Sequence, residues 1–378
     1  MGITSIVIAA ATFENKDKVV DYLIIAVWCF IALYVVRYFT MYFLYHTELA
    51  PFWLGVINER SFHSFTNPRF LNQVQSWVMP LALAIGWYYW IYKKESSYRW
   101  VMPLLLGVWL AFIIDTGGRG TALGISAGFL VILFLYIKNK SGFLMYNLAI
   151  IAISYGINYL FLDDVVEYKG RSLERISSSG RLDNWMELLP EIFSQPLLGY
   201  GPMHYASLAL ENSWGHPHNW FLQFSYEWGL VVSIVVAYIF FSSIFRFGNH
   251  IKTGIKPDTV ATKMYWVKIG LLWSLIAATI HGLVSGIIVM PMSQMWFVLI
   301  VGISLGIYLK EKKHSFDKDT RTHKLAKLIL ILISIGALSG IVIWGTQHPV
   351  YKSKANYQKY ESLDTEWKYP RYWGLGKF

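Results

Sequence analysis

The chain has 378 residues, of which 55% are hydrophobic and only 15% are charged, and its mean hydropathy is +0.40. A water-soluble domain usually carries about 25% charged residues, so this composition excludes an ordinary soluble globule and indicates a membrane protein. Cys29 is the only cysteine, which excludes an internal disulfide framework and a site built from several thiolates.

Hydrophobic blocks of about 20 residues, the length that crosses the hydrocarbon core, recur along the chain. They predict spans at 19–39, 74–92, 100–116, 120–137, 143–162, 220–245, 264–282, 285–309 and 325–345. The weaker aromatic block 40–57 is compatible with a tenth span. Residues 2–13 are apolar without a preceding basic region, so we expect a short membrane-associated segment and no cleaved signal peptide.

Four basic loops, at 93–99, 138–140, 246–263 and 310–324, separate the predicted spans. They hold fifteen Lys or Arg and five Asp or Glu, a balance of +10 that equals the net charge of the chain. If every span crosses once, these loops lie on one side, which the positive-inside rule makes cytoplasmic. The long loop 163–218, with a net charge of −4, and the tail 346–378 then lie on the opposite, outer side. The basic charge therefore reflects topology and does not indicate a nucleic-acid partner.

The first unusual outer segment runs from Asp115 to Gly120 between two predicted spans. Gly120, Gly124 and Gly128 follow at four-residue intervals, a ridge of small residues that favours close helix packing. Arg119 stands at a helix start, where the helix dipole favours anions over cations. The residue pattern leaves two interpretations open for Arg119: an arginine reaching the lipid headgroups, or one that binds an anion.

The long loop contains a second arginine, Arg181, after a serine–glycine stretch. A short amphipathic helix is predicted from there to Phe193, with Asn184 and Glu187 at the spacing of a capping box. Gln195-Pro196 ends this helix, and Gly199-Tyr200-Gly201-Pro202 predicts a tight turn.

The loop ends in His216-Pro217-His218-Asn219, directly before a span. A helix that starts near Asn219 places Asn219, Gln223 and Glu227 on one face, and a polar stripe entering a bilayer indicates a cavity or polar partners. His218 is either a solvated interfacial side chain or an acid–base group. The two histidines could suggest a metal site, but no third ligand stands at the spacing of the known zinc motifs.

Taken in order, these segments resemble the O-antigen ligase and polymerase family of membrane glycosyltransferases over about residues 65–310. The resemblance is carried by Gly118-Arg119-Gly120, Ser179-Gly180-Arg181 with Trp185, Pro196 to Gly201, His216 to Asn219, Glu227-Trp228-Gly229, His281 to Ser285 and Pro291 to Gln294. The ligase pattern of His-Asn followed by Gly is met by His218, Asn219 and Gly229. It departs at Val232, where the pattern has Gly, Thr or Tyr, so a polymerase stays open.

The resemblance implies an all-α polytopic membrane protein with a GT-C-like glycosyltransferase fold. It would form a single membrane domain (1–378) of nine or ten transmembrane helices with one large periplasmic catalytic loop (163–218). The expected reaction is the transfer of a glycan from undecaprenyl diphosphate to a lipid A–core saccharide, with inversion. It would take place at the periplasmic face of the inner membrane, with membrane lipids as surroundings and without cofactor, nucleotide sugar or metal. A polymerase that extends a polysaccharide is the alternative, and a transporter of the lipid-linked glycan is a rival from another class.

The resemblance also implies roles for single residues. Arg119 and Arg181 correspond to the positions that hold the diphosphate, and His218 corresponds to the histidine that activates the acceptor hydroxyl. The residues expected to support them are Asn219, Gln223, Glu227, Gly199, Tyr200, Gly201 and His216.

Overall fold

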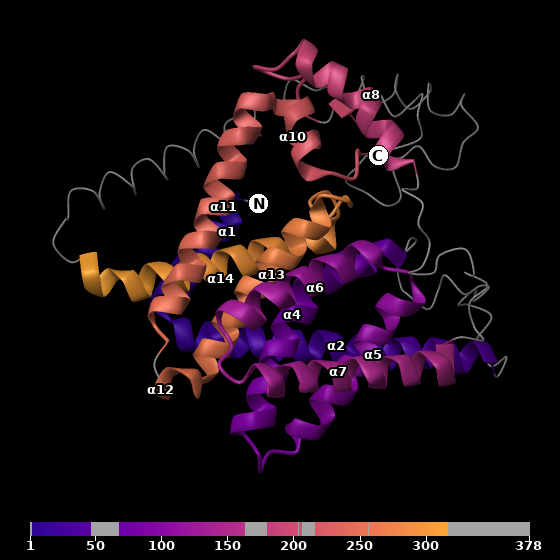
Figure 1. The fold of residues 1–378 in the computed structure, drawn as a ribbon, viewed down its shortest axis with the longest axis vertical. Helices are drawn as coiled ribbons and strands as arrows, with labels where there is room; N and C mark the ends of the chain where they lie inside the picture. Colours follow the sequence, from indigo (N-terminus) through magenta and orange to yellow (C-terminus); the bar gives the residue numbers. More distant parts are fainter. Residues whose placement is uncertain are drawn as a thin grey trace.

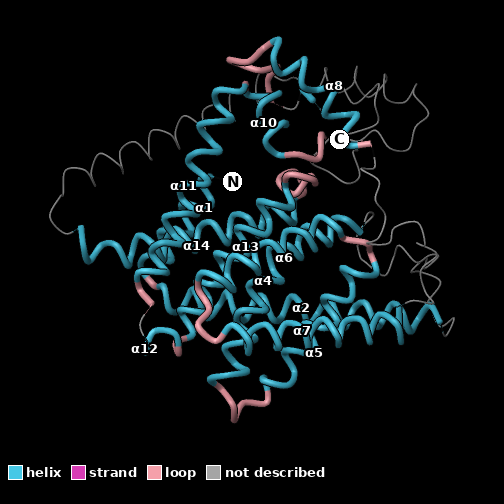
Figure 2. Tube along the Cα trace, viewed as in Figure 1, coloured by secondary structure: helices cyan, strands magenta, loops and turns pink. Residues whose placement is uncertain are grey.

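The computed structural model describes residues 2–46, 68–162, 180–202, 204–205, 216–255 and 257–316. Within these ranges the regular structure is helical, without strands (Figures 1 and 2). The helices are α1 (Gly2–Glu14), α2 (Lys16–His46), α4 (Pro68–Tyr92), α5 (Tyr98–Asp115), α6 (Arg119–Leu135), α7 (Lys140–Ile157) with a π-helical turn (Asn158–Leu162), α8 (Arg181–Ser194), α10 (Trp220–Trp228), α11 (Leu230–Thr253), α12 (Pro257–Val260), α13 (Lys263–Gly282) and α14 (Pro291–Phe316). This confirms the prediction of an all-α, polytopic protein.

Six of the described helices are long and apolar enough to cross a membrane: α2, α5, α7, α11, α13 and α14. The predicted spans 74–92 and 120–137 correspond to α4 and α6, which pack among these six. Residues 40–46 of the uncertain aromatic block prolong α2 and do not form a separate helix. The predicted span 325–345, the tail 346–378 and most of the loop 163–218 lie outside the described residues.

Two predicted span boundaries are wrong. The span expected at 220–245 consists of two helices, α10 and α11, because the chain breaks at Gly229, whose φ is 88°. A positive φ of this kind is open to glycine and ends a regular helix. The span expected at 285–309 begins later, at Pro291, because residues 283–290 form turns. Hydropathy does not register either feature, since the broken segments remain apolar.

Helix α13 is the centre of the bundle. In its most apolar window 78% of the residues are buried inside the protein, whereas only 11% are buried in the corresponding window of α11. Helix α13 therefore packs on protein along most of its length, mainly on α4 and α6. Helix α11 instead turns a largely apolar surface outward, as a lipid-facing helix does.

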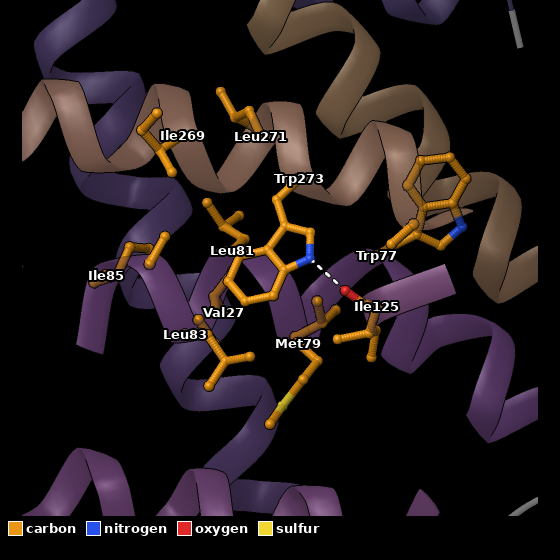
Figure 3. Packing of buried hydrophobic residues seen from close by; sticks show 14 of the residues in the cluster. Val27, Trp77, Met79, Leu81, Leu83, Ile85, Ile125, Ile269, Leu271 and Trp273 are labelled. Carbon is orange, nitrogen blue, oxygen red and sulfur yellow. Dashed lines mark hydrogen bonds between the residues drawn. The ribbon is translucent and has the colours of Figure 1, made fainter. Parts of the chain in front are cut away.

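The glycine ridge of α6 allows its close contact with α13. A Cβ at Gly124 would collide with the backbone carbonyl of Ala277, and one at Gly128 would meet the ring of Trp273. Trp273 in turn donates a hydrogen bond from Nε1 to the carbonyl of Ile125 at 2.9 Å, in the apolar core between the two helices (Figure 3). The structural interpretation of this ridge is therefore confirmed.

Charged contacts gather at one end of the bundle. Glu311 of α14 accepts hydrogen bonds from Lys16 at 3.2 Å and Lys268 at 2.9 Å, and its carboxylate lies 2.8 Å from Nε2 of His250. The start of α2, the start of α13 and the ends of α11 and α14 thus meet here, next to the basic loops. Because α13 begins at this end, its last residue, Gly282, lies at the opposite end of the bundle.

Helix α1 packs on α14 through Gly302, where a Cβ would meet Ile8.

Candidate active site

His218 is held in an unusual backbone conformation directly before α10. Its φ of 57° makes it the non-glycine residue with a positive φ among those described, a conformation that is uncommon for a side chain of this size. Its backbone N–H donates to Nδ1 of His216 at 3.2 Å, and the ring of His216 packs against Gly286 so closely that a Cβ there would overlap it. Strained residues persist where their surroundings hold them, and they cluster at functional sites.

Asn219 starts α10 as its N-cap, as expected for a helix beginning at this point. Its Oδ1 accepts hydrogen bonds from the backbone N–H groups of Phe221 at 3.0 Å and Leu222 at 3.1 Å. Gln223 and Glu227 follow on one face and are each only 5% exposed. The polar stripe is therefore buried in protein, and Asn219 fixes the direction in which the chain leaves His218.

Helix α8 brings Arg181 toward the same place. Trp185 donates from Nε1 to the carbonyl of Pro217 at 2.7 Å, and Arg181 lies four residues before Trp185 on the same helix face. The predicted capping box is wrong, because the helix already starts at Arg181 with Gly180 as its N-cap. Asn184 instead accepts a hydrogen bond from the hydroxyl of Tyr205 at 2.8 Å inside the structure.

Three arginines from three helices share this site: Arg69 of α4, Arg119 of α6 and Arg181 of α8. Burial, together with the positive charges of Arg69 and Arg119, lowers the pKa of Arg181 to about 10. Arg181 remains charged at neutral pH, and its Nε is buried without a hydrogen-bond partner among the described residues. Such a cluster of like charges is unfavourable until an anion lies between them, so it is suited to binding one.

The same charges act on His218. Burial lowers its pKa well below the ordinary 6.5, and the neighbouring His216, Arg181, Arg69 and His281 lower it further. The imidazole is therefore neutral near neutral pH and has a nitrogen lone pair that can accept a proton. The structure thus places a neutral histidine beside the arginine cluster.

Sequence reasoning did not identify Arg69. The hydropathy pattern placed the start of the span at residue 74, which left Arg69 in a connecting loop, whereas α4 begins at Pro68. The sequence does contain a pattern that could have identified Arg69. Asn72 and Ser76 follow it three and seven residues later, which is the spacing of a polar face on a helix. Both are buried, with exposures of 3% and 0%.

Asn72 holds the turn that carries Arg119. Its Nδ2 donates to the hydroxyl of Thr116 at 2.7 Å, and its side chain packs so tightly against Gly118 that a Cβ there would lie 2.9 Å from it. Arg119 is the first residue of α6, directly after this turn. The polar face of α4 therefore sets where Arg119 stands.

Gly199, Tyr200 and Gly201 do not join the arginine cluster. Their turn docks on the other end of α10: the N–H of Tyr200 donates to the carbonyl of Tyr226 and that of Gly201 to Glu227, both at 2.9 Å. From His218 to Glu227 is a rise of about 13 Å along the helix. The first glycine is needed because its φ is 63° and a Cβ would lie 2.6 Å from the N–H nitrogen of Gly229. These residues shape the end of α10.

An apolar pocket lies beside the site, between α4, α10, α11, α13 and α14. Its walls include Trp77, Trp220, Phe240 and Phe297. Trp220, the second residue after His218, forms one part of its wall, and Val236 and Phe240 of α11 form another. Within the described ranges, no group of three or more His, Cys, Asp or Glu side chains is arranged to hold a metal ion.

Residues 108–237 match the family model described as O-antigen ligase. The matched segment contains Arg119, Arg181 and His218, whereas Arg69 and His281 lie outside it. No curated protein and no solved structure matched the chain.

Proposed function

The matched part of the chain belongs to the O-antigen ligase and polymerase family, and on that premise we propose that the protein is a membrane glycosyltransferase. It transfers a glycan from undecaprenyl diphosphate to a lipid A–core saccharide at the periplasmic face of the inner membrane. The observation that carries this proposal is the position of a neutral His218 beside arginines from three helices.

The arginines fit the donor's leaving group. When the bond between the anomeric carbon and the diphosphate oxygen breaks, that oxygen gains negative charge, and guanidinium groups bind phosphate oxygens in pairs. Arg119 and Arg181 supply two such groups, and Arg69 is a third in the same cluster. The apolar pocket beside Trp220 suits the lipid portion of the donor.

His218 fits the acceptor. A sugar hydroxyl is a poor nucleophile until its proton is removed, and a neutral imidazole removes it near neutral pH. The acceptor oxygen then bonds to the anomeric carbon from the side opposite the leaving diphosphate, the proton passes to His218, and the configuration inverts. No step in this scheme uses a metal ion or nucleotide.

A His218→Ala variant tests the assignment. A general base contributes about 10²–10⁴-fold in rate, so transfer by the purified variant in detergent should fall by about that factor while donor binding persists. His216→Ala should have a smaller effect, because its ring positions the backbone of His218. Near-normal turnover of His218→Ala would remove His218 from the mechanism, and loss of the wild-type rate with a chelator would point to a metal.

Ligase and polymerase activities share this site chemistry and differ in the acceptor. A deletion of the gene followed by a gel of the surface polysaccharide separates them. Polymer that accumulates on the carrier without reaching lipid A–core indicates a ligase, and core with a single repeat indicates a polymerase. A transporter would instead leave the purified protein without any transfer activity.

A further inference from the structure

His281 is a buried histidine for which the proposed reaction has no role. It lies near the outer end of α13 and is only 4% exposed. It is close enough to His218 and Arg181 for their charges to interact. Its hydrogen bonds and packing indicate what it does.

The imidazole links three helices. Nδ1 of His281 lies 2.7 Å from the hydroxyl of Ser76 on α4 and 3.4 Å from that of Thr121 on α6. Thr121 in turn donates to the backbone carbonyl of Asn72 at 2.8 Å. Asn72 is the residue whose side chain holds the turn before α6, so the network joins the parts of α4 and α6 that carry the arginines.

The ring also fills a notch at Gly120. A Cβ at this position would lie 2.6 Å from Cδ2 and 2.9 Å from Nε2 of His281. Gly120 directly follows Arg119, so the flat ring packs under the first turn of α6. Any side chain at Gly120 would push either this turn or the ring away.

We propose that His281 is a positioning residue that holds Arg119 at its place in the diphosphate site. The inference rests on the proposed function, in which Arg119 binds the diphosphate and His218 is the base. Because a shift of about 1 Å in a binding group can reduce a rate by about 10²-fold, the loss of the hydrogen bond between His281 and Ser76, which links α13 to α4, is enough to matter. The effect should appear in the KM for the lipid-linked donor.

A pair of substitutions separates this role from general packing. The side-chain amide of asparagine places a polar atom near the position of the histidine Nδ1. His281→Asn should therefore keep the contact with Ser76 and most of the activity. Gln reaches toward the position of Nε2 instead, so His281→Gln should raise the donor KM about 10-fold or more, as should Ser76→Ala. Equal behaviour of the Asn and Gln variants would overturn the proposal. The acid limb of the Asn variant should move at most slightly to higher pH, because His281 is among the groups that lower the pKa of His218. Disappearance of a limb would overturn the proposal, because His281 would then be transferring protons.

Suppression at Gly120 gives an independent readout. Gly120→Ala should raise the donor KM because its methyl group strikes the His281 ring, and adding His281→Asn should restore activity because the shorter side chain leaves room. Gly124→Ala is the matched control: its methyl group would strike the backbone carbonyl of Ala277, so His281→Asn should not rescue it. Absence of rescue at Gly120 would contradict the proposed packing.

A double-mutant cycle with Arg119 closes the test. If His281 acts through Arg119, then His281→Gln should add little to the donor KM of Arg119→Ala. A full additive effect would refute the positioning role while leaving the proposed function intact. A normal donor KM in Arg119→Ala alone would instead refute the diphosphate site on which both rest.

Discussion

His218 combines two properties at the scale of a single residue: its backbone is fixed and its ring is neutral. The strained φ of 57° is stabilised by the His216 contact, by the Trp185 hydrogen bond to Pro217 and by the cap at Asn219. The neutral ring follows from burial among positive charges, which opposes protonation. Fixing the ring while keeping it neutral prepares it to accept a proton without rearrangement.

The pH dependence of transfer should reflect this environment. Because the pKa of His218 lies below 6.5 in the free protein, the base stays unprotonated as the pH falls to 6.5, and the acid limb of kcat/KM should lie below that value. The bound diphosphate adds negative charge and raises the pKa, so the acid limb of kcat should lie at higher pH than that of kcat/KM. Rates measured between about pH 4.5 and 8 cover the range in which both acid limbs should fall, because the ordinary histidine pKa is about 6.5. An acid limb of kcat/KM above pH 6.5 would contradict the assignment.

The arginines should require their planar shape as well as their charge. Lysine keeps the charge but loses the paired hydrogen-bond donors, and a hydrogen bond to a charged group contributes about 1.5–3 kcal/mol. Arg119→Lys and Arg181→Lys should therefore each lower kcat/KM about 10- to 100-fold. Arg69→Lys tests whether the arginine that the hydropathy pattern left in a connecting loop contributes to the same site. Arg99→Lys, at the opposite end of the bundle and stacked over Trp90 at 4.9 Å, is the control and should retain normal transfer. Full activity of the first two lysine variants would exclude bidentate binding.

At the scale of elements, the break between α10 and α11 decides how the site is built. A straight helix over residues 220–253 would leave no place for the turn at Gly199, which docks where α10 ends: the N–H of Leu230 donates to the carbonyl of Pro196 at 2.7 Å. This contact connects α8, through its following turn, to the membrane helix α11. The break therefore holds α8, which begins with Arg181, next to α10 (Figure 1).

Substitution at Gly229 should disturb this connection. Gly229 has a φ of 88°, and a Cβ there would collide with the carbonyl oxygen of Leu197, so Gly229→Ala should lower both the thermal stability in detergent and the transfer rate. With a ψ of 156°, the backbone at Gly229 lies in a region essentially confined to glycine, and such a conformation costs another residue about 1–3 kcal/mol. Gly156→Ala on α7 is the matched control, because nothing lies within 4 Å of its Cβ position, and it should be neutral or slightly stabilising. A Gly229→Ala protein with unchanged midpoint and rate would show that the break is dispensable.

At the scale of the whole molecule, the two ends of the bundle differ in chemistry. One end collects the lysines and His250 around Glu311, next to the basic loops. The other collects the arginine cluster, His218 and His281. This separation supports the proposed orientation, with the basic end in the cytoplasm and the site at the periplasmic face.

Accessibility of introduced cysteines tests that orientation. In a Cys29→Ser background, Met186→Cys on the exposed side of α8 should react with an impermeant thiol reagent in intact spheroplasts. Ser141→Cys, at the exposed start of α7, should react only after lysis. Both variants should become equally reactive in detergent, which serves as the control for exposure. The reverse pattern in spheroplasts would place the site in the cytoplasm and refute the proposed reaction.

The sequence by itself determined the class of protein and the candidates for its chemistry. Apolar blocks of membrane length lie on the described helices, since hydropathy depends only on local composition. The glycine ridge of α6 was likewise readable, because helical spacing is a local property. Arg119, Arg181 and His218 were singled out because they correspond to the diphosphate-binding and acid–base positions of the family that the chain resembles.

Only the tertiary structure decided which of these residues meet. Arg69 was missed because a polar face on an apolar helix shows its purpose only when another helix lies opposite it. His281 was quoted only as part of a motif that carries the resemblance, and its contacts could not be predicted because they come from α4 and α6. The chain break at Gly229 escaped hydropathy because the residues on both sides are apolar. Gly199, Tyr200 and Gly201 were assigned to the site by motif alone, whereas their hydrogen bonds place them at the far end of α10. Contacts between segments far apart in sequence depend on packing, which composition and spacing do not encode.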